Sequence, residues 1–287
     1  MARDEVSIHI LRKVVIDGFL LGGLIISLTA VNLLWQPFQR GFFCGDETLM
    51  YPYKDDTVTV LMLRAVGIAL PFVVVVACEW ALLRKERDDA RIFGWRLPAW
   101  LRGVYCVCVS FAIGVCFSEL ATEIAKNTIG RNRPHFFDLC KPSINCSLPE
   151  WQDRYIQSEA YSCTGDQFDK FTNMRKSFLS GHSSWAAFTM IYLALYLERR
   201  MVWRGSRILR HALQFGVLML SWYTALSRVS DYKHHWSDVL AGYALGAILA
   251  VLMFLGTDFV KRRKDHVTLP QFELNLPTNQ VSCCSRI

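Results

Sequence analysis

Six long apolar runs separated by charged segments dominate the chain. A helix needs about 20 predominantly apolar residues to cross the hydrocarbon core of a bilayer. The candidate spans are roughly 14–35, 58–83, 104–125, 183–197, 211–226 and 239–260. The fourth is short unless residues 178–183 also lie at membrane depth, and the first is long enough to favour an uncleaved span over a signal peptide. The pattern predicts an all-α integral membrane bundle of six transmembrane helices over residues 1–264, followed by a polar tail over 265–287.

The distribution of basic residues predicts the orientation of this bundle. Lys and Arg concentrate in residues 12–13, 84–96, 199–210 and 261–264, which all fall on one side of the membrane if the chain crosses it six times. Short cytoplasmic loops are enriched in Lys and Arg, so both termini are expected to be cytoplasmic. The net charge of +7 would suggest a nucleic-acid partner in a soluble protein, but here it follows the membrane topology, and no nucleic-acid partner is expected.

Four cysteines lie in polar loops that this topology places outside. They are Cys44, Cys140, Cys146 and Cys163. Disulfides persist in that compartment, but four cysteines allow three pairings and their spacing does not choose among them. The same loops carry the sequon Asn145-Cys146-Ser147, so Asn145 is a candidate glycosylation site. There is no Cys-x-x-Cys pair, which argues against a structural zinc site.

Three polar clusters stand at the predicted outer ends of the spans. The first follows the third run, the second precedes the fourth run, and the third joins the fifth run to the sixth. A helical bundle would bring these ends together around one pocket. The members that carry chemistry are Lys126, Arg133, Ser180, Gly181, His182, Arg228, His234 and Asp238.

The residue types in these clusters suit phosphate chemistry. Lys and Arg provide fixed charge and many donors for phosphate oxygens. A Ser-Gly pair before a helix lets backbone N–H groups approach an anion. His234 and Asp238 are four residues apart, so on one helix they would share a face, where the carboxylate could hold one ring nitrogen and leave the other free to attack. His182 could protonate a leaving alkoxide and then activate water.

Each cluster taken alone has a simpler interpretation. Lys and Arg near span ends usually set topology, Ser-Gly often only caps a helix, and a His–Asp pair could bind a metal. Topology does not explain three basic residues and two histidines converging on the outer face, which the positive-inside rule depletes of basic residues. The conjunction therefore favours a phosphate site.

The motifs that carry these residues resemble a known family signature. Lys126-x6-Arg133-Pro134, then Ser180-Gly181-His182, then Ser227-Arg228-x5-His234-x3-Asp238 are similar to the three-part signature of the type 2 phosphatidic acid phosphatase superfamily. Further segments, including Arg40–Cys44 and Tyr51–Lys54, resemble the animal lipid phosphate phosphatases. The sequence departs from many members at Leu179, where proline is common before Ser-Gly-His.

The resemblance implies a role for each matching residue. His234 would be the nucleophile, Asp238 would orient it, and His182 would be the acid for the leaving lipid alcohol. The phosphate would be bound by Lys126, Arg133, Ser180, Gly181 and Arg228. The reaction would need no metal and no Mg²⁺ cofactor, which agrees with the lack of a carboxylate cluster in the sequence. The implied substrates are phosphatidate, lysophosphatidate, ceramide 1-phosphate and sphingosine 1-phosphate, and the implied location is the plasma membrane, with the endoplasmic reticulum second.

Two other function classes compete with the enzyme. A non-catalytic lipid-phosphate-binding or scaffold protein on the same fold would be expected to lose the nucleophile or the phosphate-binding residues. A six-span transporter would be expected to show inverted repeats and ionisable residues near the midplane. A homo-oligomer is possible, and Gly242-x3-Gly246 could pack helices within or between subunits. Cys283 and Cys284 could be palmitoylated or simply exposed.

Overall fold

The computed structural model describes residues 2–86, 91–92, 95–151, 153–201 and 207–256. Three expectations lie outside these residues. They are the end of the sixth span beyond residue 256, the basic residues 261–264, and the polar tail with its cysteine pair.

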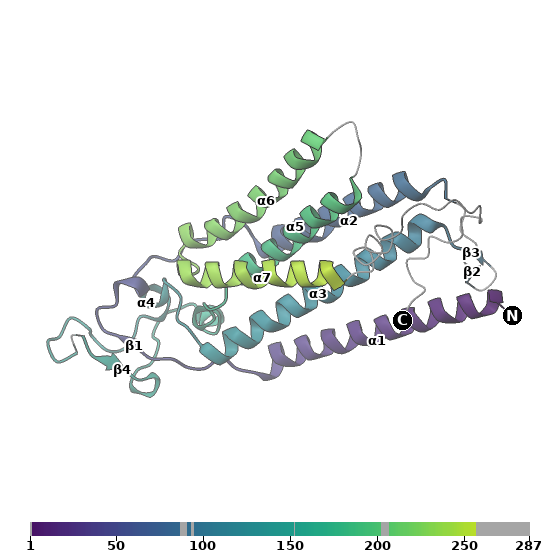
Figure 1. Ribbon diagram of the computed structural model, residues 1–287. Coiled ribbons are helices and arrows are strands. Elements are labelled where there is room, and N and C mark those ends of the chain that lie inside the picture. The colour runs from purple at the N-terminus through teal and green to yellow at the C-terminus, as the bar shows by residue number, and fades with distance from the viewer. Residues whose placement is uncertain (1, 87–90, 93–94, 152, 202–206, 257–287) are drawn as a thin grey trace.

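Six long helices form at the six apolar runs (Figure 1). They are α1 (Ala2–Leu34), α2 (Val60–Leu83), α3 (Ala99–Ile129), α5 (Gly181–Arg200), α6 (Arg207–Ser230) and α7 (Trp236–Gly256). Most begin or end a few residues beyond the predicted spans, because polar residues such as the capping Ser180 belong to helix ends without being apolar. The fourth run reaches the length of a span for this reason.

Short elements connect the long helices. The fourth helix of the chain, α4 (Phe136–Cys140), and the 3₁₀ turns η1 (Glu47–Leu49), η2 (Ser158–Ala160), η3 (Phe168–Lys170) and η4 (Asn173–Arg175) all lie at one end of the bundle. Strand β1 (Phe42–Phe43) pairs antiparallel with β4 (Tyr155–Ile156) at that end. Strand β2 (Arg91–Ile92) pairs antiparallel with β3 (Trp95–Arg96) near the start of α1, at the opposite end.

Four helices are long and apolar enough to cross a membrane, judged by length and composition. The segments are Ile10–Leu34, Val60–Leu83, Ala99–Ile129 and Trp236–Gly256. The remaining two, α5 and α6, are more polar. Most side chains of α5 are buried among other helices, so this helix can carry His, Ser and Thr without exposing them to lipid.

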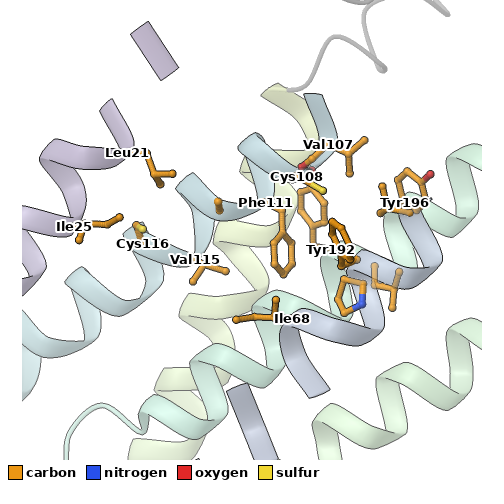
Figure 2. A pocket seen from close by; sticks show the side chains of 15 residues that line it. Leu21, Ile25, Ile68, Val107, Cys108, Phe111, Val115, Cys116, Tyr192 and Tyr196 are labelled. Carbon is orange, nitrogen blue, oxygen red and sulfur yellow. Dashed lines mark hydrogen bonds between the residues drawn. The ribbon is translucent and has the colours of Figure 1, made fainter. Parts of the chain in front are cut away.

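The central element is α5, which packs against α2, α3, α6 and α7. In contrast, α1 packs mainly against α3, along one side of the bundle (Figure 1). Buried side chains from α2, α3, α5 and α7, among them Val75, Val107, Phe188 and Tyr192, form the largest hydrophobic core. Beside this core lies a cavity of about 320 Å³ whose walls come from α1, α2, α3 and α5 (Figure 2).

Two glycines set the contact between α5 and α7. A Cβ atom at Gly242 would lie 2.5 Å from the carbonyl oxygen of Ser180, and one at Gly246 would lie 2.2 Å from that of Ser184. Both distances are too short for real contacts, so only glycine permits this approach. The Gly242-x3-Gly246 pair therefore packs helices within the subunit, which is the first of the two possibilities that the sequence left open.

Ionisable residues inside the helices have partners. Glu79 is fully buried and accepts hydrogen bonds from Arg200 Nε and Nη2, both at 2.7 Å, and from the Tyr196 hydroxyl at 2.9 Å. The Tyr105 hydroxyl donates to Asp17 at 2.9 Å, which ties α1 to α3. A buried charge without such a partner would be costly.

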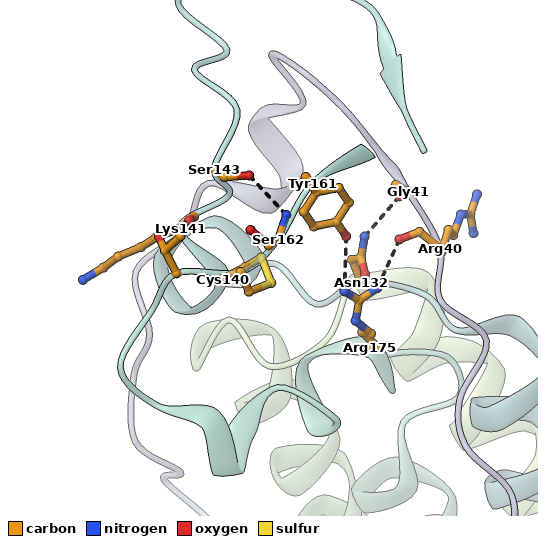
Figure 3. Close-up of a disulfide and its surroundings, with 11 residues drawn as sticks. Arg40, Gly41, Asn132, Cys140, Lys141, Ser143, Tyr161, Ser162 and Arg175 are labelled. Atoms are coloured by element: carbon orange, nitrogen blue, oxygen red, sulfur yellow. Dashed lines mark hydrogen bonds between the residues drawn. A yellow bond between two sulfur atoms is a disulfide. The ribbon is translucent and has the colours of Figure 1, made fainter. Parts of the chain in front are cut away.

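The connecting loops at the end of the bundle that carries α4 form a small folded unit. Disulfides join Cys44 to Cys146 and Cys140 to Cys163. Beside the second disulfide, Arg175 donates to the Tyr161 hydroxyl at 3.3 Å and Asn132 donates to the Gly41 carbonyl at 3.2 Å (Figure 3). A second core of aromatic and aliphatic side chains, centred on Phe42 and Phe136, fills the unit. The structure thus selects one of the three pairings that the sequence allowed.

We expect Gly246→Ala to destabilise the protein, because its methyl group must push the Ser184 carbonyl away. Overpacking of this kind costs about 1–3 kcal/mol. The matched control is Gly216→Ala in α6, where an added Cβ meets nothing within 4 Å and alanine should be neutral or stabilising by about 0.5–1 kcal/mol. Thermal unfolding in detergent, followed by intrinsic fluorescence, compares the two. Equal midpoints would contradict the assigned α5–α7 contact.

Candidate active site

The three polar clusters meet at the end of the bundle that carries α4 (Figure 1). At this end α3 finishes at Ile129, α5 begins at Gly181, and α7 begins at Trp236. The predicted convergence of the clusters is therefore observed.

The start of α5 joins the second cluster to the other two. Ser180 is the N-cap, and its hydroxyl accepts the Ser183 N–H at 3.4 Å. Its own N–H donates to the carbonyl oxygen of Asp238 at 3.1 Å. Gly181 lies against Lys126, because a Cβ there would stand 3.1 Å from the Lys126 Nζ. Ser180 and Gly181 thus form a cap and also border the lysine.

His234 is buried and held by a backbone oxygen. Its Nδ1 lies 2.6 Å from the carbonyl oxygen of Ser177. A carbonyl can only accept, so Nδ1 carries the proton and Nε2 keeps its lone pair. Burial lowers the pKa of His234 well below its usual value, and the charges of Arg133, Lys126 and Arg228 lower it further. The geometry therefore presents a neutral imidazole with one nitrogen available as a nucleophile.

Asp238 occupies a different position from the one that the sequence predicted. One carboxylate oxygen accepts from Arg131, and the other accepts from the Ser177 hydroxyl at 2.6 Å and the His235 N–H at 3.2 Å. The predicted contact between the Asp238 carboxylate and the His234 ring is wrong. It required both residues on one helix face, but α7 begins at Trp236 and His234 lies in the preceding turn. Asp238 positions His234 through Ser177, whose hydroxyl it binds and whose carbonyl binds the ring.

Arg228 is buried and faces the loop before α2. Its guanidinium donates to the Val58 carbonyl at 3.0 Å and pairs with Asp56. Lys233 Nζ lies 3.7 Å from the same carboxylate. Burial alone would raise the pKa of Asp56, but the hydrogen bond and the charge from Arg228 outweigh it and lower the pKa. Asp56 therefore remains a carboxylate that fixes two cations.

Arg133 is bound by neutral groups. Its Nη2 donates to Asn173 Oδ1 at 2.8 Å and to the Lys176 carbonyl at 3.4 Å. Burial, and then the charge of Arg228, lower the pKa of Arg133 to about 10, so it stays charged at neutral pH. Its Nε is buried and has no hydrogen-bond partner among the residues that the structure describes, and the same is true of Arg228 Nε. Two buried charged donors of the site thus have no partner in the described part of the chain.

Lys126 has a carboxylate neighbour on its own helix. Its Nζ lies 2.6 Å from Glu123 Oε1, and Lys176 Nζ lies 3.6 Å from the other oxygen of that carboxylate. Lys126 and Lys176 both keep donors that Glu123 does not use, since an ammonium group has three. Of the two lysines, Lys126 lies against Gly181.

His182 lies in the first turn of α5. Its Nε2 is 3.1 Å from the Val58 carbonyl, the same oxygen that Arg228 binds. By the argument used for His234, Nε2 of His182 carries a proton and Nδ1 is left to exchange one with a substrate. The pair of histidines is thus held by two backbone carbonyls.

Sequence reasoning missed several residues of this site. They are Asp56, Glu123, Arg131, Lys176, Ser177, Asp231 and Lys233. Arg131 lies between two predicted phosphate ligands and could have been included on that ground. Asp56 offered no local signal, because it precedes a span and becomes part of the site only through the packing of α2. The part of the chain that the structure describes holds no group of three or more His, Cys, Asp or Glu side chains arranged for a metal ion.

We expect the ring of His234 to stay neutral at pH 6, where a free histidine with pKa about 6.5 is mostly protonated. Burial and the surrounding cations penalise the charged form, so protonation requires a lower pH. Nitrogen-15 NMR of histidine-labelled protein in detergent, with the signal assigned by His234→Gln, measures this. A ring that titrates at or above the free value would contradict the buried, cation-flanked geometry.

Comparisons with known proteins match this site. The PAP2 superfamily matches residues 103–262, a range that contains all three clusters. A Drosophila melanogaster relative named for phosphatidate phosphatase activity is 44% identical over 77% of this chain and 62% of its own length. Rat phospholipid phosphatase 1 is 42% identical over 81% of this chain and 83% of its own length.

A human relative is similar to the same extent. Human phospholipid phosphatase 2 is 39% identical over 86% of this chain and 82% of its own length. No solved structure matches the chain significantly. With a family match over more than half of its residues and curated relatives covered over most of their length, the chain belongs to the PAP2 superfamily.

Proposed function

We propose that this chain, a phosphoric monoester hydrolase of the phosphatidate phosphatase class, removes phosphate from lipid phosphates through a phosphohistidine intermediate on His234. The reaction takes place at the outer or luminal face of the membrane and needs no metal ion. The substrates are phosphatidate, lysophosphatidate, ceramide 1-phosphate and sphingosine 1-phosphate.

The observation that carries the proposal is the set of unused groups around His234. Arg133 Nε and Arg228 Nε are buried charged donors without partners among the described residues. Such donors are costly unless a ligand satisfies them. Both arginines act on the pKa of His234, which places them within electrostatic reach of its ring. A phosphate between the arginines would satisfy these donors and stand beside the free Nε2.

The first chemical step would transfer the phosphoryl group to His234. Nε2 attacks phosphorus, so that a P–N bond forms while the ester P–O bond breaks. For this step His182 must be protonated on both ring nitrogens; its Nε2–H stays on the Val58 carbonyl, and its Nδ1 proton passes to the leaving alkoxide, which departs as the lipid alcohol and leaves His182 neutral. The Ser177 carbonyl accepts a hydrogen bond from Nδ1–H throughout and stabilises the positive charge that develops on the ring.

The second step would release phosphate and restore both histidines. A water molecule gives its proton to His182, its oxygen attacks phosphorus, and the P–N bond breaks with the electron pair returning to Nε2. The products are inorganic phosphate and neutral His234. Arg133, Arg228 and Lys126 would bind the phosphoryl oxygens in both steps, and fixed donors of this kind stabilise the charge of the transition state.

Arginine and lysine supply the charge that a magnesium ion supplies in other phosphoryl-transfer enzymes. The site gathers six cationic side chains, namely Lys126, Arg131, Arg133, Lys176, Arg228 and Lys233. This surplus over the site's carboxylates supports the proposal that the reaction is independent of metal.

A six-span topology with both termini in the cytoplasm would place this site outside. The four apolar helices support a membrane protein, and we assign α5 and α6 as the two further spans. The disulfides and the exposed Asn145 lie at the same end as the site, which agrees with an external or luminal location. The plasma membrane is the proposed location, with the endoplasmic reticulum as the alternative.

A non-catalytic lipid-phosphate-binding or scaffold protein is the competing function. It needs the arginines but not a nucleophile. The neutral, backbone-held ring of His234 favours the enzyme, because burying a histidine among cations serves no purpose in binding an anion. Binding alone would be served better by a protonated ring.

We expect His234→Ala to lower phosphate release from lysophosphatidate in excess EDTA by about 10⁶-fold, the order of loss seen when a nucleophile is removed. His182→Ala should cost about 10²–10⁴-fold as an acid–base residue. The matched control is His211→Ala, an exposed histidine of α6, which should retain full activity. Purified protein in mixed micelles, checked for folding by size exclusion, is assayed for inorganic phosphate. Activity retained by His234→Ala would overturn the mechanism, and wild type that binds but does not hydrolyse would favour the scaffold function.

We expect Asn145 to carry an N-linked glycan in animal cells, because its side chain is exposed at the end proposed to be outside. Treatment with a peptide N-glycosidase should increase the electrophoretic mobility of the protein, and Asn145→Gln should abolish that shift. Antibody labelling of an epitope tag at the N-terminus, on intact cells, provides the control for orientation. An accessible N-terminus on intact cells with an unmodified Asn145 would reverse the proposed topology.

A further inference from the structure

The cavity beside the core lies among helices that also form the active site. Its volume is about 320 Å³, and its lining is almost entirely apolar, with Ile68 and Phe72 from α2, Ala112 and Cys116 from α3, Tyr192 from α5 and Ile25 from α1 (Figure 2). The tyrosine hydroxyls are bound elsewhere, since Tyr192 donates to the Val107 carbonyl at 3.4 Å and Tyr196 donates to Glu79. The cavity therefore offers a surface suited to hydrocarbon.

The same helix faces connect the cavity to the phosphate-binding residues. Along α3, Lys126, Glu123, Glu119, Cys116 and Ala112 recur at intervals of three or four residues and so share one face. Lys126 stands at the phosphate end of this face, and Cys116 and Ala112 line the cavity. One continuous stripe of α3 thus runs from the phosphate site to the cavity.

A second stripe runs along α2. Arg64, Ile68, Phe72 and Val75 also recur at helical spacing, and the last three line the cavity. Arg64 lies 4.0 Å from Glu119 and its guanidinium stands over the ring of Trp185 at 5.9 Å. This ion pair forms a polar band between the phosphate site above and the apolar cavity below.

The near end of the cavity lies within reach of a lipid chain. Ten residues separate Lys126 from Cys116, the nearest lining residue of α3, and nineteen separate it from Val107, the farthest, so along the helix the cavity extends from about 15 Å to about 28 Å from Lys126. The hydrocarbon core of a bilayer is about 30 Å thick, so a chain anchored at one face extends about 15 Å to the midplane. A lipid with its phosphate at Lys126 would place its linkage region near the polar band and its distal methylenes at the cavity.

The arrangement of α1 gives a chain access from the bilayer. This helix supplies only Leu21 and Ile25 to the lining. It packs along α3 and makes no comparable contact with α2 in the described chain. The side of the cavity between α1 and α2 is therefore not closed by helix packing, and a chain can enter it laterally.

We propose that this cavity receives the distal part of an acyl chain of the substrate lipid and makes the enzyme favour long chains. The inference rests on the proposed lipid phosphatase function and deepens it. A short chain would end at the polar band and gain nothing from the cavity, whereas a long chain would bury its end methylenes there.

The test compares dioctanoyl and dipalmitoyl phosphatidate in the same mixed micelles, with wild type, Ala112→Phe and the control Ala244→Phe. Ala112 lines the cavity, whereas Ala244 is exposed on α7. We expect Ala112→Phe to lower kcat/KM for the long substrate by roughly tenfold, a discrimination typical of a filled hydrophobic pocket, and to leave the short substrate within about twofold. Ala244→Phe should change neither. An unchanged ratio, or an equal loss for both substrates in folded protein, would overturn the inference and assign the cavity to a structural lipid or to packing.

A second measurement needs no substitution that fills the cavity. A lysophosphatidate analogue with a photoreactive group near the end of its chain is irradiated with intact His234→Ala protein, and labelled peptides are identified by mass spectrometry. Labels in α2 and α3 within 68–75 and 107–116, competed by unlabelled lysophosphatidate, are expected. Labels confined to lipid-facing α6 or α7 would contradict the inference. Failure of wild type to hydrolyse even the dioctanoyl substrate would instead count against the proposed function.

Discussion

The buried carboxylate of Asp238 joins the segments on which the active site depends. Its oxygens bind Arg131 after α3, Ser177 before α5 and the backbone of His235 before α7, and its own carbonyl accepts the N–H of Ser180. These segments are far apart in the sequence, and further hydrogen bonds, such as that from the Ser177 N–H to the Arg131 carbonyl, add to the links that Asp238 makes. A fully satisfied buried network of this kind specifies a single arrangement, because leaving any member unpaired costs the full desolvation of that group.

Charge balance explains how so many cations tolerate burial at one place. Asp56 holds Arg228 and Lys233, Glu123 holds Lys126 and Lys176, and Asp238 holds Arg131. Each carboxylate offsets part of the desolvation cost of its partners. Arg133 has neutral partners and so keeps the least compensated charge. The carboxylates fix the cations in place, and fixed charges of this kind are what the proposed electrostatic catalysis requires.

The apolar helices and the central helix differ in composition and in surroundings. The apolar helices α1, α2, α3 and α7 carry the composition expected of membrane spans. The central helix α5 is enclosed by its neighbours, so it can place His182 at its first turn and still carry polar side chains along its length. Its close approach to α7 depends on Gly242 and Gly246, and that approach sets the distance between Ser180 and Asp238.

The sequence by itself determined the long helices and the end of the bundle where the polar clusters meet, and it singled out His234, His182 and the neighbouring cations as candidates for phosphate chemistry. Apolar periodicity and residue chemistry are local properties, so they can be read from the sequence without knowledge of the fold. Only the tertiary structure decided that Ser177 rather than Asp238 holds the ring of His234, that Cys44 pairs with Cys146, and that Asp56 and Glu123 belong to the site. The contacts of Ser177 with His234, Cys44 with Cys146 and Asp56 with Arg228 join residues 57 to 172 positions apart, and such pairings follow from how the helices pack, which no local pattern encodes. Glu123 and Lys126 are three residues apart on α3, so the packing adds only Lys176 to that pair.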